Sequence, residues 1–200
     1  PAPGPVFVLG LHAADTARVA RGLARHGAIE NLGEPPHLLR MAGDFGGGFA
    51  APGPDGRAPA LNAALLADMG PAEWAALGRQ YLGRCAAERR GTRPLFVDGM
   101  PANWLHLGLV HLMLPGARIV ALRRAPMAAG FALFASAGGG PAHAFDQRGI
   151  ARCCRAYDDL MAHFDAVLPG RVHHVQCEAL AADPEAAMRG LLAHCGLPFE

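Results

Sequence analysis

The sequence predicts an α/β fold in which helices cover both faces of a central parallel sheet. Two observations lead to this fold class. Short apolar runs rich in valine, isoleucine and phenylalanine alternate with helical patterns along the 200 residues, and strands that are separated by helices pair in parallel and are covered on both sides. The length fits a single domain, residues 1–200, with a sizeable buried core.

Four strands are expected at the apolar runs. The run at 118–122 is continuous and partly β-branched, as is typical of a buried parallel strand. The run at 6–9 stops at a glycine, and the run at 171–176 follows a Pro-Gly pair that favours a turn. The predicted strands are 6–9, 94–97, 118–122 and 171–176.

Helices are expected between these strands, where apolar residues recur at helical spacing. In 16–26, Val19 and Leu23 share one face and Gly27 stands where the helix would end. Asp183 followed by Pro184 is a typical helix start. Residues 41–60 are rich in glycine and proline and are predicted as a loop. The predicted helices are 16–26, 71–90, 101–114, one from Pro126 towards the glycines at 138–140, 146–168, and one from Pro184 to Gly196.

The charged residues exclude several kinds of partner and chemistry. The 18 basic and 17 acidic residues leave a net charge of +1, which argues against broad binding to nucleic acid or to anionic membranes. No apolar run is long enough to predict a membrane span. All 18 basic residues are arginine, so a phosphate-loop lysine and a Schiff-base lysine are both excluded.

The five cysteines predict buried thiols rather than a disulfide framework or a metal site. They are odd in number and include no Cys-x-x-Cys pair, which favours a reducing compartment and a cytoplasmic location. His173 and His174 are neighbours on a predicted strand, so they point to opposite faces and predict no metal site.

The stretch from Val6 to Thr16 has the outline of an anion-binding loop. A strand stops at Gly10 and a helical pattern begins near Thr16, and a strand, a tight turn and a helix N-terminus together present backbone N–H groups to a phosphate. This loop carries the carboxylate of Asp15 and no arginine. Because ligands bind at the carboxyl ends of parallel strands, the candidate site is expected at 10–16, 98–101 and 123–126.

Segments along nearly the whole chain resemble the sulfotransferase family, in particular its bacterial branch akin to tyrosylprotein sulfotransferases, which is often fused behind tetratricopeptide repeats. The segments that carry this resemblance are Gly10 after the first strand, His26-Gly-Ala-Ile-Glu-Asn-Leu-Gly-Glu34, Asp98-Gly-Met-Pro-Ala-Asn103, Arg118-Ile-Val-Ala-Leu-Arg-Arg-Ala-Pro126, Arg155-Ala-Tyr-Asp-Asp-Leu-Met-Ala-His163 with the turn to Arg171, Asp183-Pro184-Glu185 and Leu192-Ala-His-Cys-Gly-Leu-Pro198.

The resemblance implies a P-loop-like three-layer sandwich that transfers a sulfuryl group from 3′-phosphoadenosine 5′-phosphosulfate to a hydroxyl acceptor, which is a peptide, a carbohydrate or a small molecule. It places Gly10 and Thr16 in the donor-binding loop and Arg124 on the donor's 3′-phosphate. Glu34 falls on the carboxylate proposed as general base in the tyrosylprotein branch. An adjacent helical-repeat region is an implied partner.

The donor loop is degenerate by comparison with the family pattern. The family's Pro-Arg-Ser-Gly is replaced by His12-Ala13-Ala14-Asp15, and each lost charged hydrogen-bond partner typically costs about 1.5–3 kcal/mol. We therefore expect weak or lost activity, and we expect the segment that closes over the nucleotide in the family to be missing after Leu197-Pro198. The other replacements are Gly99 for a lysine, Ala125 for an aspartate and Ala132 for a serine.

Three hypotheses about function remain open at this stage. The first is a sulfotransferase with an eroded donor site, the second a working sulfotransferase in which Arg124, His12 or Arg18 replaces the lost cation, and the third a non-catalytic module for protein interaction. Asp15 is interpreted as a helix N-cap that occupies the anion site.

Three further residues at the predicted site have an ordinary interpretation beside the functional one. Thr16 is predicted as an N-cap, a ligand contact or both. Glu34, taken as an isolated residue, is interpreted as a solvated loop carboxylate rather than a base. Arg123 is interpreted as the partner of a neighbouring carboxylate.

Overall fold

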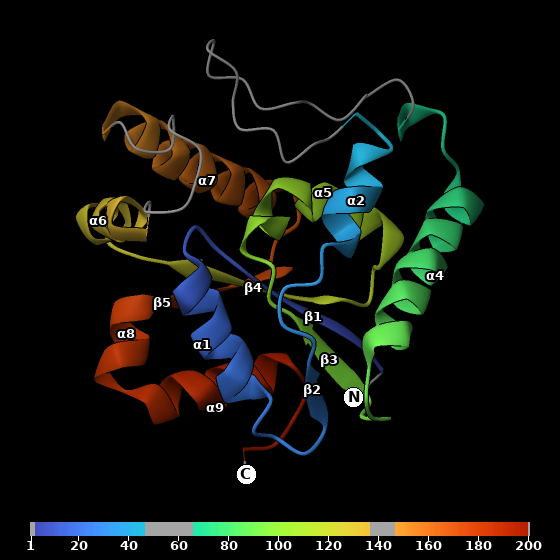
Figure 1. Cartoon of the computed structure of the whole chain (residues 1–200), viewed down its shortest axis with the longest axis horizontal. Helices are drawn as coiled ribbons and strands as arrows, with labels where there is room; N and C mark the ends of the chain where they lie inside the picture. The colour runs from blue at the N-terminus through green and yellow to red at the C-terminus, as the bar shows by residue number, and fades with distance from the viewer. Residues whose placement is uncertain (1–2, 47–65, 137–146, 200) are drawn as a thin grey trace.

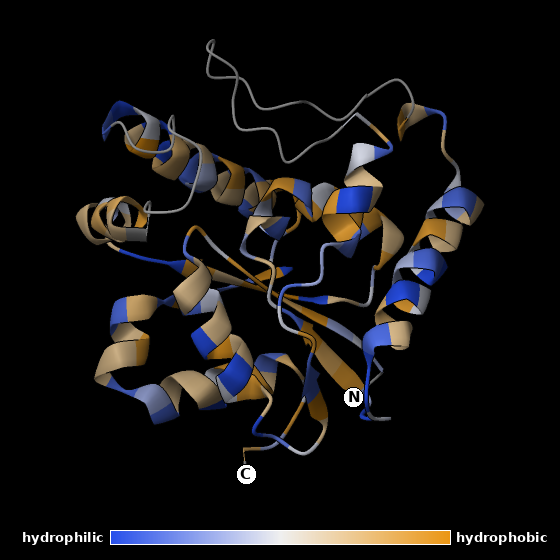
Figure 2. Cartoon of the chain, viewed as in Figure 1, coloured by the Kyte–Doolittle hydropathy of each residue, from blue (hydrophilic) through white to orange (hydrophobic). Residues whose placement is uncertain are grey.

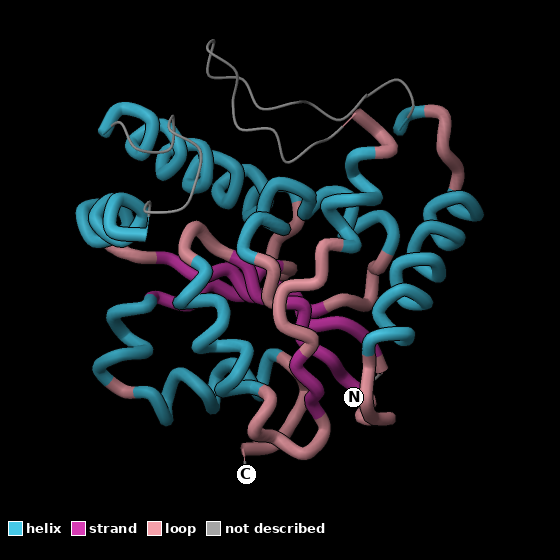
Figure 3. The backbone as a smooth tube through the Cα atoms, in the orientation of Figure 1, coloured by secondary structure: helices cyan, strands magenta, loops and turns pink. Residues whose placement is uncertain are grey.

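A five-stranded parallel sheet forms the centre of the computed structural model, which describes residues 3–46, 66–136 and 147–199. The strands lie in the order β2-β3-β1-β4-β5, and Figure 3 shows them between helices on either side. The α/β fold class expected from the sequence is therefore confirmed. The strands are β1 (Gly4–Leu9), β2 (Ile29–Asn31), β3 (Leu95–Asp98), β4 (Arg118–Arg123) and β5 (Val172–Gln176).

The central strand β1 separates two hydrophobic cores. Its side chains alternate between the two faces of the sheet, so that Phe7 and Leu9 enter one core while Val6 and Val8 enter the other. All four are fully buried, which explains why a strand in this position reads as a continuous apolar run. Figure 2 shows the same apolar character along the central strands.

Helices cover both faces of the sheet, as Figure 1 shows. The core that contains Val6 is closed by α1 (Ala13–Leu23), α8 (Cys177–Ala182) and α9 (Pro184–His194). The core that contains Phe7 is closed by α2 (His37–Gly43), α4 (Pro71–Glu88), the 3₁₀ helix η1 (Pro101–His106), α5 (Leu107–Met113) and α7 (Gln147–Val167). Helix α6 (Pro126–Ser136) follows β4 and packs against α7.

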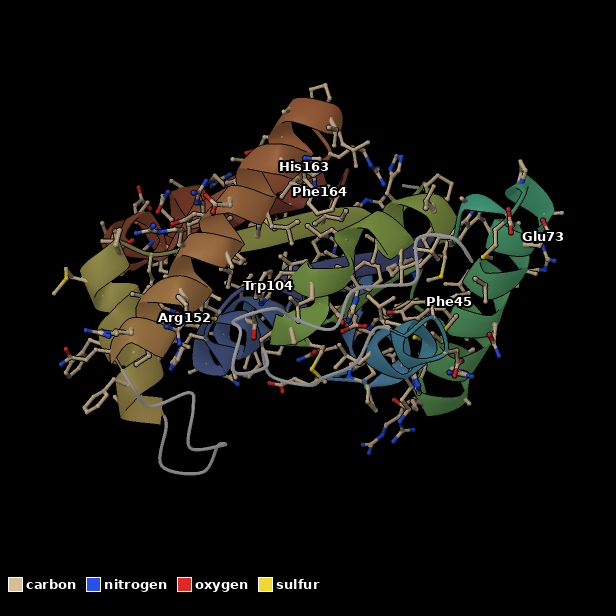
Figure 4. All side chains as sticks on the ribbon, turned by 90° about the horizontal axis from the view of Figure 1, so that it is seen from above. Phe45, Glu73, Trp104, Arg152, His163 and Phe164 are labelled. Atoms are coloured by element: carbon tan, nitrogen blue, oxygen red, sulfur yellow. The ribbon has the colours of Figure 1, made fainter. Side chains whose placement is uncertain are left out.

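Figure 4 views the molecule from the side of α2, α5 and α7. It shows Trp104, which comes from η1, close to α7. The ring of Trp104 meets that of Tyr157 edge to face, with 5.4 Å between their centroids. The Tyr157 hydroxyl donates a 2.9 Å hydrogen bond to the carbonyl of Leu122 on β4, so α7 is fixed to the sheet beside the candidate site.

The four predicted strands are confirmed to within two residues, but one strand and two helices were missed. Strand β2 has three residues, of which Ile29 alone is buried, so no apolar run marks it. The short helix α2 contains His37–Gly43, which corrects the start of the loop predicted for 41–60; positions 47–60 of that loop lie outside the described residues. Helix α8 has only six residues.

Other predicted boundaries change for local reasons. Helix α1 begins at Ala13, three residues earlier than predicted, because two alanines at its start favour helix. It ends at Leu23, so Gly27 is not its terminator. The helix predicted for 101–114 is divided into η1 and α5. The predicted start of α9 is confirmed, because the Asp183 carboxylate accepts a hydrogen bond from the Ala186 N–H.

Candidate functional site

The candidate site lies where the carboxyl ends of β1 and β4 meet. Gly10 passes so close to β4 that a Cβ atom there would lie 3.2 Å from Leu122 Cβ and 3.3 Å from the Leu122 carbonyl oxygen, so a larger residue would push the two strands apart. The Gly10 N–H donates to the Pro101 carbonyl at 3.2 Å. Gly10, predicted in the donor-binding loop, therefore has its N–H bound within the fold.

The first turn of α1 differs from the predicted arrangement. His12 occupies the N-cap position and no side chain caps the helix, so the interpretation of Asp15 as the N-cap is wrong; Asp15 is the third residue of the helix. Thr16 is also inside the helix and is not an N-cap. Its side chain is fully buried and its Oγ1 donates to the Ala13 carbonyl at 3.0 Å.

The Asp15 carboxylate binds the guanidinium of Arg124 through two hydrogen bonds. Arg124 Nε donates to Asp15 Oδ2 at 2.7 Å and Arg124 Nη2 donates to Asp15 Oδ1 at 2.6 Å. The side chains are 13% and 30% exposed. This bidentate geometry is the one by which arginine recognises carboxylates and phosphates. Asp15 thus occupies the face of Arg124 that a phosphate would use.

The charges of the pair reinforce each other. Burial by itself raises the pKa of Asp15, but the hydrogen bonds and charge of Arg124 outweigh it and lower the pKa below its ordinary value. The hydrogen bonds from Arg124 to Asp15 raise the pKa of the guanidinium. Asp15 also lies in the first turn of α1, where the helix dipole favours a negative charge. Both groups are therefore charged across the physiological range.

Neighbouring polar groups at this edge also have partners within the fold. Arg123 Nη2 donates to Asp158 Oδ1 at 2.9 Å, so the ion pair that was expected for Arg123 is present. The N–H of Ala125, just before α6, donates to Glu178 Oε1 at 2.9 Å. His12 Nδ1 lies 3.6 Å from Asp15 Oδ2. Arg124 and His12, which were predicted as alternative cations of the site, both face Asp15.

The space around the Asp15–Arg124 pair is small. A cavity of about 30 Å³ is lined by residues from the β1–α1 loop and the start of α1, the end of β4, α6, α7 and the start of α8. One water needs at least about 10–15 Å³ of such volume, so the cavity has room for about two or three waters and is too small for a nucleotide. Cys177 lies at this cavity, where burial raises the pKa of its thiol to about 11.

Three residues of this cluster were missed as site residues by sequence reasoning: Asp158, Cys177 and Glu178. Cys177 and Glu178 follow β5 directly, so the rule that places ligands at strand ends contained the signal for them. Asp158 lies in the middle of α7, and no local pattern distinguishes it from the other charged residues of that helix.

Glu34 lies at the same edge of the sheet but away from Arg124. It follows Gly33, which adopts a φ of 71° that favours glycine. Its side chain is exposed, and within the described part of the chain it has no hydrogen bond or ion pair. Strands β3 and β1 lie between β2 and β4, which separates the ends of β2 and β4 by about 14 Å at ordinary strand spacing. The structure does not bring Glu34 and Arg124 together.

A second buried polar cluster lies between these two positions, at the end of β3. The Asp98 carboxylate is fully buried and accepts hydrogen bonds from the Tyr81 hydroxyl at 2.7 Å, the Met100 N–H at 3.0 Å and Asn103 Nδ2 at 3.0 Å. Burial raises the pKa of Asp98 to about 7, despite these three bonds. The next residue, Gly99, donates its N–H to the Gly33 carbonyl at 2.8 Å.

Gly99, which is predicted from the sequence to stand at the position of the family's lysine, has little room for a side chain. A Cβ atom there would lie 3.0 Å from the Gly33 carbonyl oxygen and 3.4 Å from Ala20 Cβ. Among the described residues, no group of three histidine, cysteine or carboxylate side chains is arranged to hold a metal ion. The helices of the described chain include none that is long and apolar enough to cross a bilayer. All five cysteines are free thiols.

The sequence is similar to that of a curated protein. An uncharacterized protein of Aquifex aeolicus (strain VF5) is 26% identical over 204 residues, which cover 100% of this chain and 26% of that protein. The chain thus spans about a quarter of the length of this relative.

Solved structures share the fold. The sulfotransferase domain from the curacin biosynthetic pathway aligns with a TM-score of 0.59 at 16% identity, over 99% of this chain and 75% of that one. A sulfotransferase from Alicyclobacillus acidocaldarius aligns with a TM-score of 0.57 at 18% identity, over 98% of this chain and 82% of that one. The sulfotransferase domain of the Synechococcus PCC 7002 olefin synthase aligns with a TM-score of 0.58 at 19% identity, over 100% of this chain and 75% of that one.

A sequence profile described as "Sulfotransferase family" matches residues 5–200, which is almost the entire chain. Its match includes the loop after β1, the turn after β3 and the end of β4. The chain belongs to the sulfotransferase family.

Proposed function

We propose that this domain is a sulfotransferase whose donor site is blocked by its own side chains, so that sulfuryl transfer from 3′-phosphoadenosine 5′-phosphosulfate to a hydroxyl acceptor is weak or lost. The observation that carries the proposal is the bidentate pair between Asp15 and Arg124. Arg124 is the proposed contact of the donor's 3′-phosphate, and its Nε and Nη2 groups already donate to a carboxylate of the same chain.

The pair opposes nucleotide binding in two ways. A phosphate that reaches Arg124 exchanges one pair of charge-assisted hydrogen bonds for another, so the gain is small. The displaced Asp15 carboxylate then repels the phosphate, by about 1 kcal/mol at 4 Å in water and about 4 kcal/mol at an effective dielectric of 20. These energies lower affinity between about fivefold and several hundred fold.

The neighbourhood supplies little to offset this repulsion. Arg123 is paired with Asp158, the N–H of Ala125 is bound to Glu178, and the chain has no lysine. Arg18 is exposed on α1 and does not line the small cavity at Arg124. Sulfuryl transfer, like phosphoryl transfer, depends on positioned charge, so we propose that rate as well as affinity is reduced.

The test is a calorimetric titration with 3′-phosphoadenosine 5′-phosphate. We expect no binding by the natural chain at millimolar nucleotide, and a gain of at least tenfold in Asp15→Asn, because the carboxylate no longer competes for Arg124. Adding Ala13→Arg to Asp15→Gly supplies a cation and removes the side chain, and is expected to bind more tightly still. Adding Arg124→Ala to either variant is expected to abolish the gain.

Glu185→Gln is the matched control for charge. It removes one carboxylate from an exposed pair with Arg189 on α9, so it changes the net charge by the same amount at a distant place. Micromolar binding by the natural chain that is lost in Arg124→Ala would overturn the blocked-site proposal and favour a working sulfotransferase. An equal gain in Glu185→Gln and Asp15→Asn would show that net charge, and not the pair, limits binding.

A further inference from the structure

Helix α6 exposes large apolar side chains to solvent. Met127, Phe131 and Phe134 are 87%, 73% and 57% exposed, and their spacing of four and three residues places them along one stripe of the helix. The 11 residues Pro126–Ser136 include no charged side chain, and Figure 2 draws the helix in apolar colours. A helix that is apolar all round is normally buried, so the exposed stripe indicates a binding surface.

The stripe borders a groove between α6 and α7, which lie side by side (Figure 1). The groove has a volume of about 770 Å³, within the range of about 300–1,000 Å³ that is usual for small-molecule sites. Ile150 and Ala151 from α7 lie opposite the α6 stripe in its lining. At Gly130 on α6, an added Cβ atom would meet Ile150 Cγ2 at 3.6 Å, so the absence of a side chain there keeps the groove open.

The charge at the edge of the groove is positive. Two charged side chains line it, Arg155 and Asp158. The Asp158 carboxylate is neutralised by Arg123 at 2.9 Å, whereas Arg155 is exposed and forms no ion pair within the described residues. Arg152, one turn earlier on α7 (Figure 4), is also exposed. The groove therefore combines an apolar floor with a free guanidinium at its edge.

We propose that the α6–α7 groove binds a single-chain amphiphile that has an apolar tail and an anionic head, such as a fatty-acid carboxylate or an alkyl sulfate. The tail lies along Met127, Phe131 and Phe134, and the head binds Arg155. A free amphiphile fits a concave site of this volume better than a membrane surface, which is flat. The groove borders the cavity at the Asp15–Arg124 pair, since Pro126, Cys154 and Asp158 line both, but neither member of the pair lines the groove. The proposal therefore goes beyond sulfuryl transfer and does not require it.

The test compares decanoate, hexanoate and decyltrimethylammonium by calorimetry, at concentrations where each is monomeric. Because each buried methylene contributes about 0.8 kcal/mol, or roughly fourfold in affinity, decanoate is expected to bind on the order of 100-fold more tightly than hexanoate. The cationic amphiphile is expected to bind more weakly than decanoate, and Arg155→Gln is expected to reduce that preference about threefold to fivefold, as befits an exposed charge.

Two variants address the groove itself. Gly130→Leu fills it and is expected to reduce decanoate affinity at least tenfold, while the replacement of a helical glycine does not weaken the helix. Phe131→Asp removes one exposed aromatic ring from the stripe and is expected to act in the same direction. Arg152→Gln removes a charge from the same helix outside the groove lining and is the matched control, with little expected change.

Four results would overturn the proposal. The first is equal binding of decanoate and decyltrimethylammonium, and the second is unchanged decanoate binding in a Gly130→Leu variant with native circular dichroism. The third is binding to phosphatidylglycerol vesicles without binding to monomeric decanoate, which would assign the stripe to a membrane surface. The fourth is self-association in sedimentation velocity that Phe131→Asp abolishes, in a chain that does not bind decanoate.

Discussion

Replacing the buried carboxylate at the end of β3 tests how the turn beside the candidate site is held. Asp98 accepts three hydrogen bonds, from Tyr81, Met100 and Asn103, and burial raises its pKa to about 7. An unfolded aspartate has a pKa of about 3.9. The folded protein therefore keeps a proton on Asp98 between about pH 4 and pH 7, where the unfolded chain has released it.

The sign of the pH effect follows from this difference. Because the folded-state pKa is raised, the stability that Asp98 contributes is complete below about pH 4 and is lost as the pH rises to about 7. Between pH 5 and pH 7 the folded protein holds a proton on Asp98 that the unfolded chain has released. Over these two pH units the free energy of unfolding therefore falls by about 2.7 kcal/mol, at 1.36 kcal/mol for each unit. Asp98→Asn cannot ionise and is expected to lack this loss.

Other groups require that the variant be compared with the natural chain at each pH. Burial lowers the pKa of His106 to about 4, so this histidine stabilises the fold as the pH rises from about 4 to about 6.5, in the opposite direction to Asp98. Burial also lowers the pKa values of His173 and His194. These effects are common to both proteins, so they cancel in the difference between the two stabilities.

The assay is urea unfolding at pH 5 and pH 8, followed by circular dichroism and extrapolated linearly to water. The stability of Asp98→Asn relative to the natural chain is expected to rise by about 2.7 kcal/mol between the two pH values. Asp44→Asn, at an exposed position after α2, is the control. A relative stability of Asp98→Asn that is constant to within about 0.5 kcal/mol would refute the argument, because Asp98 would then ionise like an ordinary aspartate.

Two further predictions concern stability. Gly78→Ala on α4 is expected to destabilise the fold by more than about 2 kcal/mol, because its Cβ atom would lie 2.2 Å from the Met113 carbonyl oxygen. Gly83→Ala, on the exposed side of the same helix, is expected to stabilise the fold by up to about 1 kcal/mol. Equal effects of the two variants in thermal unfolding would contradict this expectation. Asp15→Asn is expected to cost about 1–3 kcal/mol at pH 7 by breaking the pair with Arg124. Because the pKa of Asp15 is lowered, this cost begins to shrink below the ordinary aspartate pKa of about 4 and is lost as the pH falls through the lower, folded-state pKa. A cost in urea unfolding that does not shrink between pH 7 and pH 2 would show that the charge is not its source.

The parts of the fold that the sequence predicts best are those buried on two sides. Strands β1 and β4 lie inside the sheet, so their residues 6–9 and 119–122 are buried and apolar and form a continuous signal. Strand β2 is at the edge and buries Ile29 alone, so its three residues look like a loop. Its pairing with β3 depends on a partner more than 60 residues away, which local periodicity cannot show.

The sequence predicts which segments lie at the carboxyl ends of the strands, but it does not show which of their side chains are in contact. The rule that ligands bind at strand ends located the loop after β1 and the end of β4. Asp15 and Arg124 are separated by 109 positions in the chain, and their contact depends on β4 lying next to β1, which the alternation of strands and helices does not specify. Asp15 and Arg124 can each be identified in the sequence, but only the order of the strands shows that their side chains meet.

The contact between Asp15 and Arg124 also changes how the replacements in the donor loop should be weighed. By comparison with the predicted donor-loop pattern, the absent arginine and the carboxylate of Asp15 are two separate defects of an anion site. In the structure the Asp15 carboxylate accepts two short hydrogen bonds from Arg124, so the guanidinium at the end of β4 has a charged partner without a bound ligand. The same arginine that is proposed to bind a phosphate then stabilises the fold, and any variant that restores nucleotide binding by removing Asp15 must lose that stabilisation until the nucleotide is bound. Recovery of binding and loss of stability are therefore expected to be coupled in Asp15→Asn, and a variant that gains the first without the second would separate the two roles assigned to Arg124.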